Sequence, residues 1–88
     1  MLFTAKCYWP GVAEDDLRAA IESVEAEGSV VLHGMLHLPG DELVLCVFES
    51  SSSAEVKQEC ERVGLPCERV IDTVLISTSQ GELVCPSW

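Results

Sequence analysis

The sequence predicts a single α+β domain built in the order strand, helix, strand, strand, helix, strand. Three observations support this prediction: apolar runs with the two-residue alternation of strands, two segments with helical spacing of apolar residues, and Pro-Gly signals between elements. The order is that of a ferredoxin-like fold, a four-stranded antiparallel sheet with two helices on one face. The 88 residues suffice for one domain, so we assign residues 1–78 to it and residues 79–88 to a C-terminal tail.

The first part of the chain predicts a strand followed by a helix. Residues 2–9 are aromatic and apolar and stop at Pro10-Gly11, which is typical of a strand that ends in a turn. Acidic residues crowd the start of the next segment, where the positive end of a helix favours carboxylates. Apolar residues at helical spacing continue to Gly28, so the first helix is predicted over residues 13–27.

The centre of the chain predicts a β-hairpin. Residues 29–38 and 42–49 alternate and flank a Pro-Gly-Asp turn. A regular pairing that sets His33 opposite Cys46 and His37 opposite Glu42 gathers the most apolar side chains on one face. That set, which is expected to lie under the helices, comprises Val30, Leu32, Leu36, Leu38, Leu43, Leu45 and Val47.

The last part of the chain predicts the second helix and the fourth strand. Ser52-Ser53-Ala54-Glu55 fits a capping box that opens a helix, and Gly64-Leu65-Pro66 ends it. The β-branched run over residues 68–78 is the expected fourth strand.

The other face of the sheet is expected to be both apolar and functional. It would carry Leu2, Thr4, Lys6, Tyr8, Val31, His33, Met35, His37, Glu42, Val44, Cys46 and Phe48. In a ferredoxin-like sheet the first strand lies beside the third, which leaves Phe3, Ala5 and Cys7 for the core. Such a face is too apolar to remain in water, and the same face of a second copy is the simplest cover for it. We therefore expect a homodimer, a dimeric α/β barrel with a space enclosed between the two sheets.

Composition and charge argue against several classes of partner. The formal net charge of −10 would repel nucleic acid and anionic membranes, and no apolar run approaches the roughly 20 residues of a membrane span. The first residues do not have the pattern of a secretory signal. The five cysteines form no C-x-x-C pair, which argues against a disulfide framework or a zinc knuckle, so we expect a cytoplasmic protein.

Histidine and cysteine on the open face are candidate metal ligands. His33 and His37 would lie about 13 Å apart along the strand, too far to hold one ion together. Cross-strand neighbours are nearer, and an imidazole beside a thiolate at Cys46 suits nickel, copper or zinc. Each residue also has a structural interpretation, because His33 could be a hydrogen-bonded strand residue and Cys46 a small buried apolar one.

Certain segments resemble a family of small bacterial proteins, and these are Trp9-Pro10-Gly11-Val12, Cys46-Val47-Phe48-Glu49-Ser50 and Gly64-Leu65-Pro66-Cys67-Glu68-Arg69-Val70. The family is catalogued as a domain of unknown function, and some members are described as nickel-binding ferredoxin-like dimers. The resemblance implies a homodimer without a redox cofactor that binds nickel or another divalent metal. Family members often carry a histidine five residues before the glycine of the Gly-Leu-Pro segment. Here that residue is Glu59, which joins His33, His37 and Cys46 as a candidate metal ligand.

Three functions follow as expectations. The first is a metal-binding homodimer, more consistent with the sequence than an enzyme, because the chain has no nucleophile elbow, phosphate loop or carboxylate dyad. The alternative is a small cofactor-free enzyme of the oxygenase or isomerase type. In it His33 or His37 would act as acid and base, and Lys6 or Tyr8 would polarise the substrate. A third possibility is an interaction module that binds no small ligand.

Overall fold

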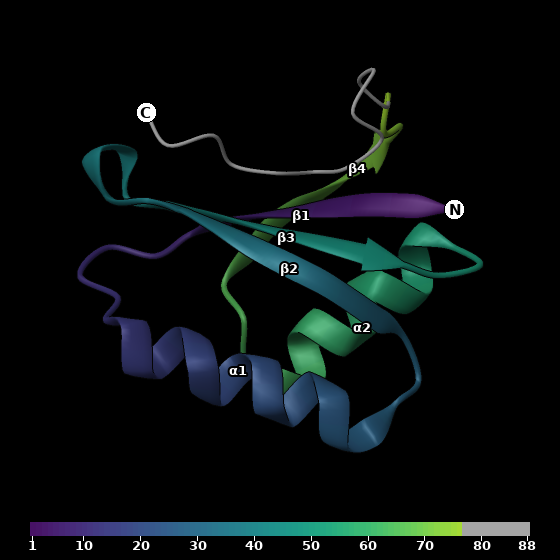
Figure 1. Ribbon diagram of the computed structural model, residues 1–88, viewed down its shortest axis with the longest axis horizontal. Coiled ribbons are helices and arrows are strands. Elements are labelled where there is room, and N and C mark those ends of the chain that lie inside the picture. The colour runs from purple at the N-terminus through teal and green to yellow at the C-terminus, as the bar shows by residue number, and fades with distance from the viewer. Residues whose placement is uncertain (77–88) are drawn as a thin grey trace.

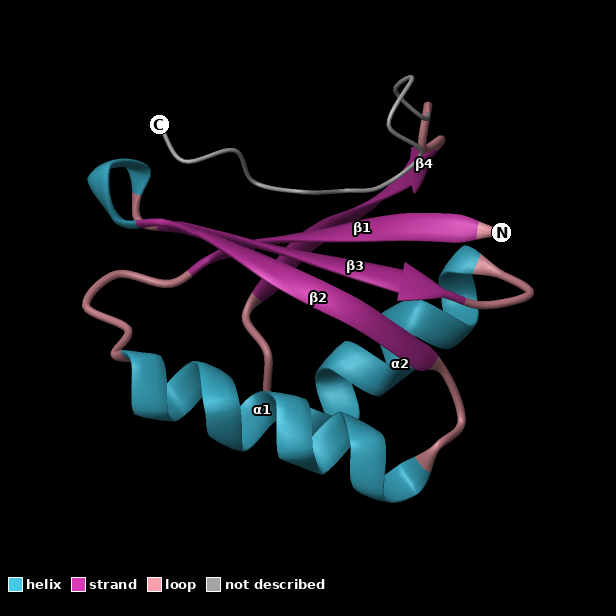
Figure 2. Cartoon of the chain, viewed as in Figure 1, coloured by secondary structure: helices cyan, strands magenta, loops and turns pink. Residues whose placement is uncertain are grey.

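The computed structural model describes residues 1–76 and confirms the ferredoxin-like α+β fold. One antiparallel sheet has the strand order β2-β3-β1-β4. Its strands are β1 (Leu2–Tyr8), β2 (Val31–Leu38), β3 (Leu43–Glu49) and β4 (Cys67–Thr73). Helices α1 (Glu14–Glu27) and α2 (Ser53–Val63) lie on the same side of the sheet (Figure 1, Figure 2). The predicted tail and the last two residues of the predicted fourth strand lie outside the described residues.

Both helices begin and end where the local sequence dictates. The N–H of Ala13 donates to the Asp16 carboxylate at 3.0 Å before α1, and the N–H of Glu55 donates to Ser52 Oγ at 3.2 Å at the start of α2. These contacts satisfy backbone donors that a helix cannot pair internally. Gly64 ends α2 with a φ of 78°, a left-handed conformation that glycine adopts without a steric penalty.

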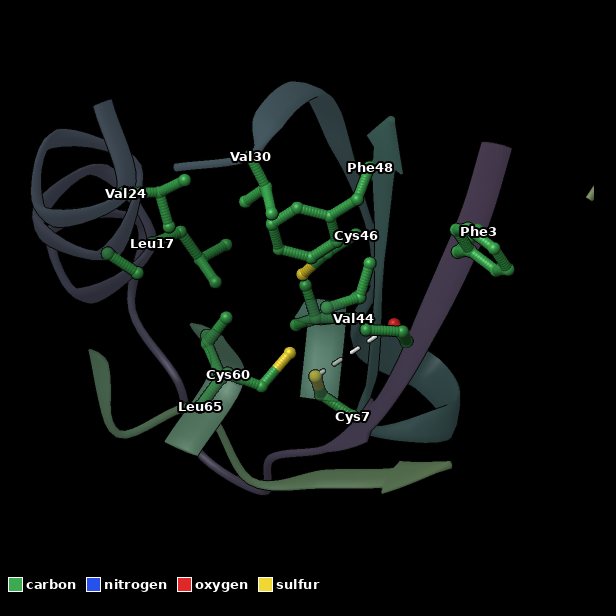
Figure 3. Close-up of a cluster of buried hydrophobic side chains, with 13 residues drawn as sticks. Phe3, Cys7, Leu17, Val24, Val30, Val44, Cys46, Phe48, Cys60 and Leu65 are labelled. Atoms are coloured by element: carbon green, nitrogen blue, oxygen red, sulfur yellow. Dashed lines mark hydrogen bonds between the residues drawn. The ribbon is translucent and has the colours of Figure 1, made fainter. Parts of the chain in front are cut away.

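The core fills the space between the sheet and the two helices (Figure 3). Its buried apolar residues are Phe3, Ala5, Cys7, Leu17, Ala20, Val24, Val30, Val44, Cys46, Phe48, Val56, Cys60 and Leu65. The prediction that Phe3, Ala5 and Cys7 of the first strand face the helices is therefore confirmed.

The side chains of β3 have the opposite orientation to the prediction. Val44, Cys46 and Phe48, expected on the open face, are each 0% exposed and lie in the core beneath the helices. Cross-strand partners share a face, and Phe48 pairs with Phe3 of β1, whose side chain is also buried. The alternate β3 residues, expected under the helices, therefore lie on the other face.

A β-bulge in β2 explains the error. The register with β3 shifts between Leu32 and Gly34, where β2 carries His33 as an extra residue. An extra residue reverses the alternation of side chains along the strand. Leu32 therefore packs against the core, whereas Leu36, which regular alternation would place beside it, is 56% exposed on the open face.

The bulge also separates the three β2 residues that were expected to point away from the helices. Met35 and His37 pair with Cys46 and Val44, so both lie on the helix side of the sheet, and Met35 packs against the core. For these two residues the prediction is wrong. Only His33, in the bulge itself, reaches toward the open face.

Candidate functional site

The side of the sheet away from the helices is here called the open face. By register it carries Leu2, Thr4, Lys6, Tyr8, Val31, His33, Gly34, Leu36, Leu38, Leu43, Leu45, Val47, Glu49, Arg69, Ile71 and Thr73. Several of its large side chains are well exposed, including Tyr8 at 48%, Val31 at 54% and Leu36 at 56%. Neither described helix lies on this face (Figure 2). It is an apolar surface that contains a few polar and charged groups.

His33 and Glu49 form a polar pair at one corner of the open face. His33 Nε2 lies 2.8 Å from Glu49 Oε1, and the side chains are 48% and 54% exposed. The bulge places His33 there, and Glu49 is the last residue of β3, opposite Leu2 of β1. The hydrogen bond from His33 and the charge of its ring lower the pKa of the Glu49 carboxyl. An imidazole nitrogen and an ionised carboxylate oxygen therefore already converge on the same region of space.

Glu49 is the residue that sequence reasoning missed. The predicted pairing sets His33 opposite Cys46 and therefore does not bring Glu49, at the end of β3, beside it. Glu49 belongs to the Cys46-Val47-Phe48-Glu49-Ser50 segment, and its alternation with Val47 and Leu45 was a usable signal.

Cys46 does not lie beside His33. Its partner in β2 is Met35, its partner in β1 is Ala5, and its side chain is 0% exposed below the helices. The thiol of Cys46 contacts that of Cys7, where the mutual hydrogen bond and burial raise the pKa of Cys7. The predicted His33–Cys46 ligand pair is therefore wrong, and the alternative interpretation of Cys46 as a small buried apolar residue is correct.

His37 and Glu42 are not cross-strand partners, because His37 pairs with Val44. Both nevertheless border a surface hollow of about 390 Å³ beside Trp9 and Val12. Glu42 has a φ of 56°, unusual for a residue with a side chain, and its carbonyl accepts a hydrogen bond from the N–H of Trp9 at 2.8 Å. His37 thus lies on the opposite side of the sheet from His33.

Glu59 is buried between the helices, with 4% of its side chain exposed, and faces neither histidine. Its carboxylate accepts hydrogen bonds from Arg62 Nη2 at 2.6 Å, from Arg62 Nε at 2.9 Å and from Ser29 Oγ at 3.3 Å. Arg62 also donates to the carbonyl of Ser23 at 2.9 Å, which ties α2 to α1. With these partners Glu59 serves as a structural ion pair.

The Glu59–Arg62 pair should make the free energy of unfolding depend on pH. Hydrogen bonds from Arg62 lower the pKa of Glu59 despite its burial, so this stabilisation is complete above the ordinary glutamate pKa of about 4.3. The stabilisation is lost as the pH falls through the lowered pKa of Glu59 in the folded protein. Arg62→Gln should cost about 2 kcal/mol at pH 7, less than for a fully buried pair because Arg62 is 39% exposed.

Urea unfolding between pH 7 and pH 2 measures this effect, and the wild type should lose more stability on acidification than Arg62→Gln. Arg18→Gln is the matched control, since Arg18 pairs with Glu14 at 2.6 Å with both side chains at least 70% exposed. Its cost should stay below about 0.5 kcal/mol. Equal effects of the two substitutions would contradict a structural role for Glu59.

The four predicted ligands therefore occupy separate places in the molecule. His33 lies on the open face, Cys46 in the core, His37 at a surface hollow and Glu59 between the helices. Within residues 1–76, no three side chains of histidine, cysteine, aspartate or glutamate converge to hold an ion. Residues 1–76 supply two converging ligands on the open face, so a metal there would need further ligands such as water or a second copy of the chain.

No helix of residues 1–76 has both the length and the apolar character needed to cross a membrane.

Comparison with known proteins identifies a solved structure with a similar fold. No family model matches the chain, and no curated protein matches it. Among solved structures, the fold is similar to that in the crystal structure of SCO4226 from Streptomyces coelicolor A3(2), with a TM-score of 0.74. The match covers 88% of this chain and 100% of that chain at 21% sequence identity. A likeness at this identity shows that the two chains share a fold.

Proposed function

We propose that the protein is a small homodimeric metal-binding protein, in which two open faces meet and His33 and Glu49 bind a divalent transition metal such as nickel. The observation that carries the proposal is the convergence of His33 Nε2 and Glu49 Oε1 at 2.8 Å on an apolar face. An ion that replaces the shared proton would bind both groups with only small side-chain movements. This assignment replaces Cys46 with Glu49 as the partner of His33.

The ligand chemistry fits a transition metal. Neutral imidazole is a good ligand for nickel, copper and zinc, and a carboxylate contributes charge that partly neutralises the ion. The lowered pKa of Glu49 keeps this carboxylate ionised even at pH values somewhat below the ordinary glutamate pKa. The formal net charge of −10 also favours the approach of cations.

The dimer follows from the exposed apolar side chains of the open face. Covering Tyr8, Val31 and Leu36 would remove apolar surface from water, at roughly 25 cal/mol per Å². A two-fold axis would bring a second His33–Glu49 pair onto the same interface. The remaining coordination positions would then be filled by the partner or by water, in a homodimer of the kind that the family resemblance implies.

A cofactor-free enzyme is the second candidate. The open face also carries the polar groups of Lys6, Thr4 and Thr73, and the hydroxyls of Thr4 and Thr73 lie 2.6 Å apart. Lys6 Nζ lies 3.8 Å from the Glu68 carboxylate, so its ammonium group already has a partner. Turnover of a candidate substrate by the metal-free protein would favour this alternative.

Calorimetric titration with NiCl₂ tests the proposal. The wild type should bind, and His33→Ala and Glu49→Gln should each weaken binding by at least about tenfold. Affinity should also fall as the solution is acidified, because a protonated imidazole cannot bind a metal.

His37→Ala is the matched control, because His37 is also an exposed β2 histidine but lies on the other side of the sheet. It should leave the affinity unchanged, as should Cys46→Ser in a folded variant. The proposal fails if the wild type binds no nickel, or if His37→Ala weakens binding while His33→Ala does not.

A further inference from the structure

A second surface hollow of about 390 Å³ lies between α2 and the edge strand β4. Its lining includes Ser53 and Lys57 from the helix and Cys67, Glu68 and Arg69 from the strand. Arg69 pairs with Lys6, so this residue of the edge strand borders both the groove and the open face. In the strand order β2-β3-β1-β4, this edge is the far one from His33. We call it the β4 groove, and nothing in the proposed metal site uses it.

The β4 groove is unusually basic for this chain. Lys57 and Arg69 are two of only five Lys and Arg residues, against fifteen carboxylates. The one acidic residue in the lining, Glu68, already has a cationic partner in Lys6 at 3.8 Å. Concentrated positive charge in an acidic protein favours an anionic ligand there.

A thiol lies at the edge of this groove, with further thiols behind it. Cys67 is partly buried, and its Sγ donates to the carbonyl of Arg69 at 3.3 Å. Cys7 of β1 is its cross-strand partner, next to a register shift in the β1–β4 pairing. The two thiols are close enough for each to shift the pKa of the other. Cys60 adjoins Cys67, and the Cys7, Cys46 and Cys60 sulfurs point toward a common region of the core (Figure 3).

The backbone geometry suits a bond between Cys7 and Cys67. Directly opposed residues of antiparallel strands have Cα atoms about 5 Å apart, within the range that a disulfide spans. Cys67 is accessible from the β4 groove, whereas Cys7 is 0% exposed. A reagent in the groove would therefore meet Cys67 first, and Cys7 only through it.

We propose that the β4 groove is a site of thiol–disulfide exchange with a small anionic disulfide of the glutathione class, in which Cys67 reacts first and Cys7 resolves the product. The Cys67 thiol gives its proton to solvent, and its sulfur attacks one sulfur of the incoming disulfide. That S–S bond breaks, a Cys67 mixed disulfide forms and one small thiolate leaves. The Cys7 thiol then loses its proton to solvent as its sulfur attacks Cys67 Sγ, and the second small thiolate leaves. Two protein thiols are oxidised by two electrons, and the small disulfide is reduced to two thiols.

The surroundings of Cys67 set the conditions for the test. Burial and the neighbouring Cys7 thiol raise the pKa of Cys67, with a smaller opposing effect from the hydrogen bond with Cys60. Only the thiolate attacks, so the reaction is best followed at alkaline pH, above the ordinary thiol pKa of about 8.5.

The experiment treats the full chain, carrying Cys85→Ser, with glutathione disulfide and follows the intact mass and the cysteine-containing peptides. The parent protein should lose two hydrogens and yield a Cys7–Cys67 peptide pair. Cys7→Ala should stop at one glutathionyl group on Cys67, and Cys67→Ser should give neither product. Lys57→Gln combined with Arg69→Gln should slow the reaction roughly fivefold. The same double variant should react normally with the uncharged 2-hydroxyethyl disulfide.

Three outcomes would overturn the proposal. The first is a parent protein whose Cys67 stays unmodified under these conditions. The second is trapping of the adduct by Cys60→Ala but not by Cys7→Ala, which would make Cys60 the resolving residue. The third is an equal effect of the two charge substitutions on both disulfides, which would remove the role of the groove in binding. Peptide mapping of the parent protein decides the first point even if a core variant fails to fold.

Discussion

Replacing Phe48 by Ala should lower the free energy of unfolding by about 4 kcal/mol, the largest single effect expected in this chain. Phe48 is 0% exposed, and its ring lies in the core near Val30 and Cys46 (Figure 3). Removing the ring loses its transfer free energy and leaves a cavity that the surrounding strands and helices cannot close fully. Urea unfolding at pH 7 followed by circular dichroism measures the loss.

Leu45→Ala is the matched control for Phe48→Ala. Leu45 lies on the same strand but on the open face, where it is only half-buried. Its effect on unfolding of the monomer should be about 1 kcal/mol, because less apolar surface is lost. If Leu45→Ala destabilised the monomer more than Phe48→Ala, the observed face assignment of β3 would be wrong.

The second large effect is expected at the proposed dimer interface. Leu36→Asp places a carboxylate at a 56% exposed position of the open face, where folding of the monomer tolerates it. In a dimer through this face, the charge would be buried without a partner, at a cost of about 3 kcal/mol. The dimer should therefore dissociate at roughly 100-fold higher protein concentration. Sedimentation equilibrium at several concentrations measures the change.

Ala19→Asp is the matched control, because it adds the same charge to an exposed position of α1, on the helix side of the molecule. It should leave the dimer intact. A wild type that sediments as a monomer at micromolar concentration, or equal dissociation of both variants, would refute an interface through the open face. Deleting residues 79–88 in a parallel sample separates a contribution of that segment from one of the sheet.

The order of elements could be predicted from the sequence because each boundary has a local cause. Ser52 and Glu55 mark the start of α2, and the glycines after both helices adopt the left-handed conformation that their positions require. The strand pairing of β1 with β3 and the burial of Phe3 also followed from the pattern. These features depend on a few neighbouring residues, so the sequence specifies them directly.

The orientation of β3 could not be predicted, because both faces of the hairpin are apolar. Alternation along β3 does not distinguish Leu45 from Cys46 as the residue that faces the helices. The leucines at every second position of β2 favoured Leu45, which is the wrong residue. The bulge at His33 decides the matter, and it arises from pairing with β3 rather than from any local motif. Because the prediction did not include the extra residue in β2, it placed the candidate ligand Cys46 on the open face, whereas the structure buries Cys46 in the core.

The structural role of Glu59 has a signal in the sequence, although the family resemblance points to a metal ligand at this position. Arg62 follows three residues later in a helix, a spacing at which side chains of opposite charge meet. The contact of Glu59 with Ser29, thirty residues earlier, depends on how the two helices pack and has no sequence signal.

X-ray diffraction from crystals grown with NiCl₂, with data collected on both sides of the nickel absorption edge, tests the central claim most directly. We expect an anomalous peak on the open face, within bonding distance of His33 Nε2 and Glu49 Oε1, at an interface between two copies of the chain. Nickel–ligand distances should be near 2.1 Å, as for other divalent transition metals bound by histidine. A peak confined to His37, or a nickel-loaded protein in which His33 and Glu49 retain their direct hydrogen bond, would contradict the account.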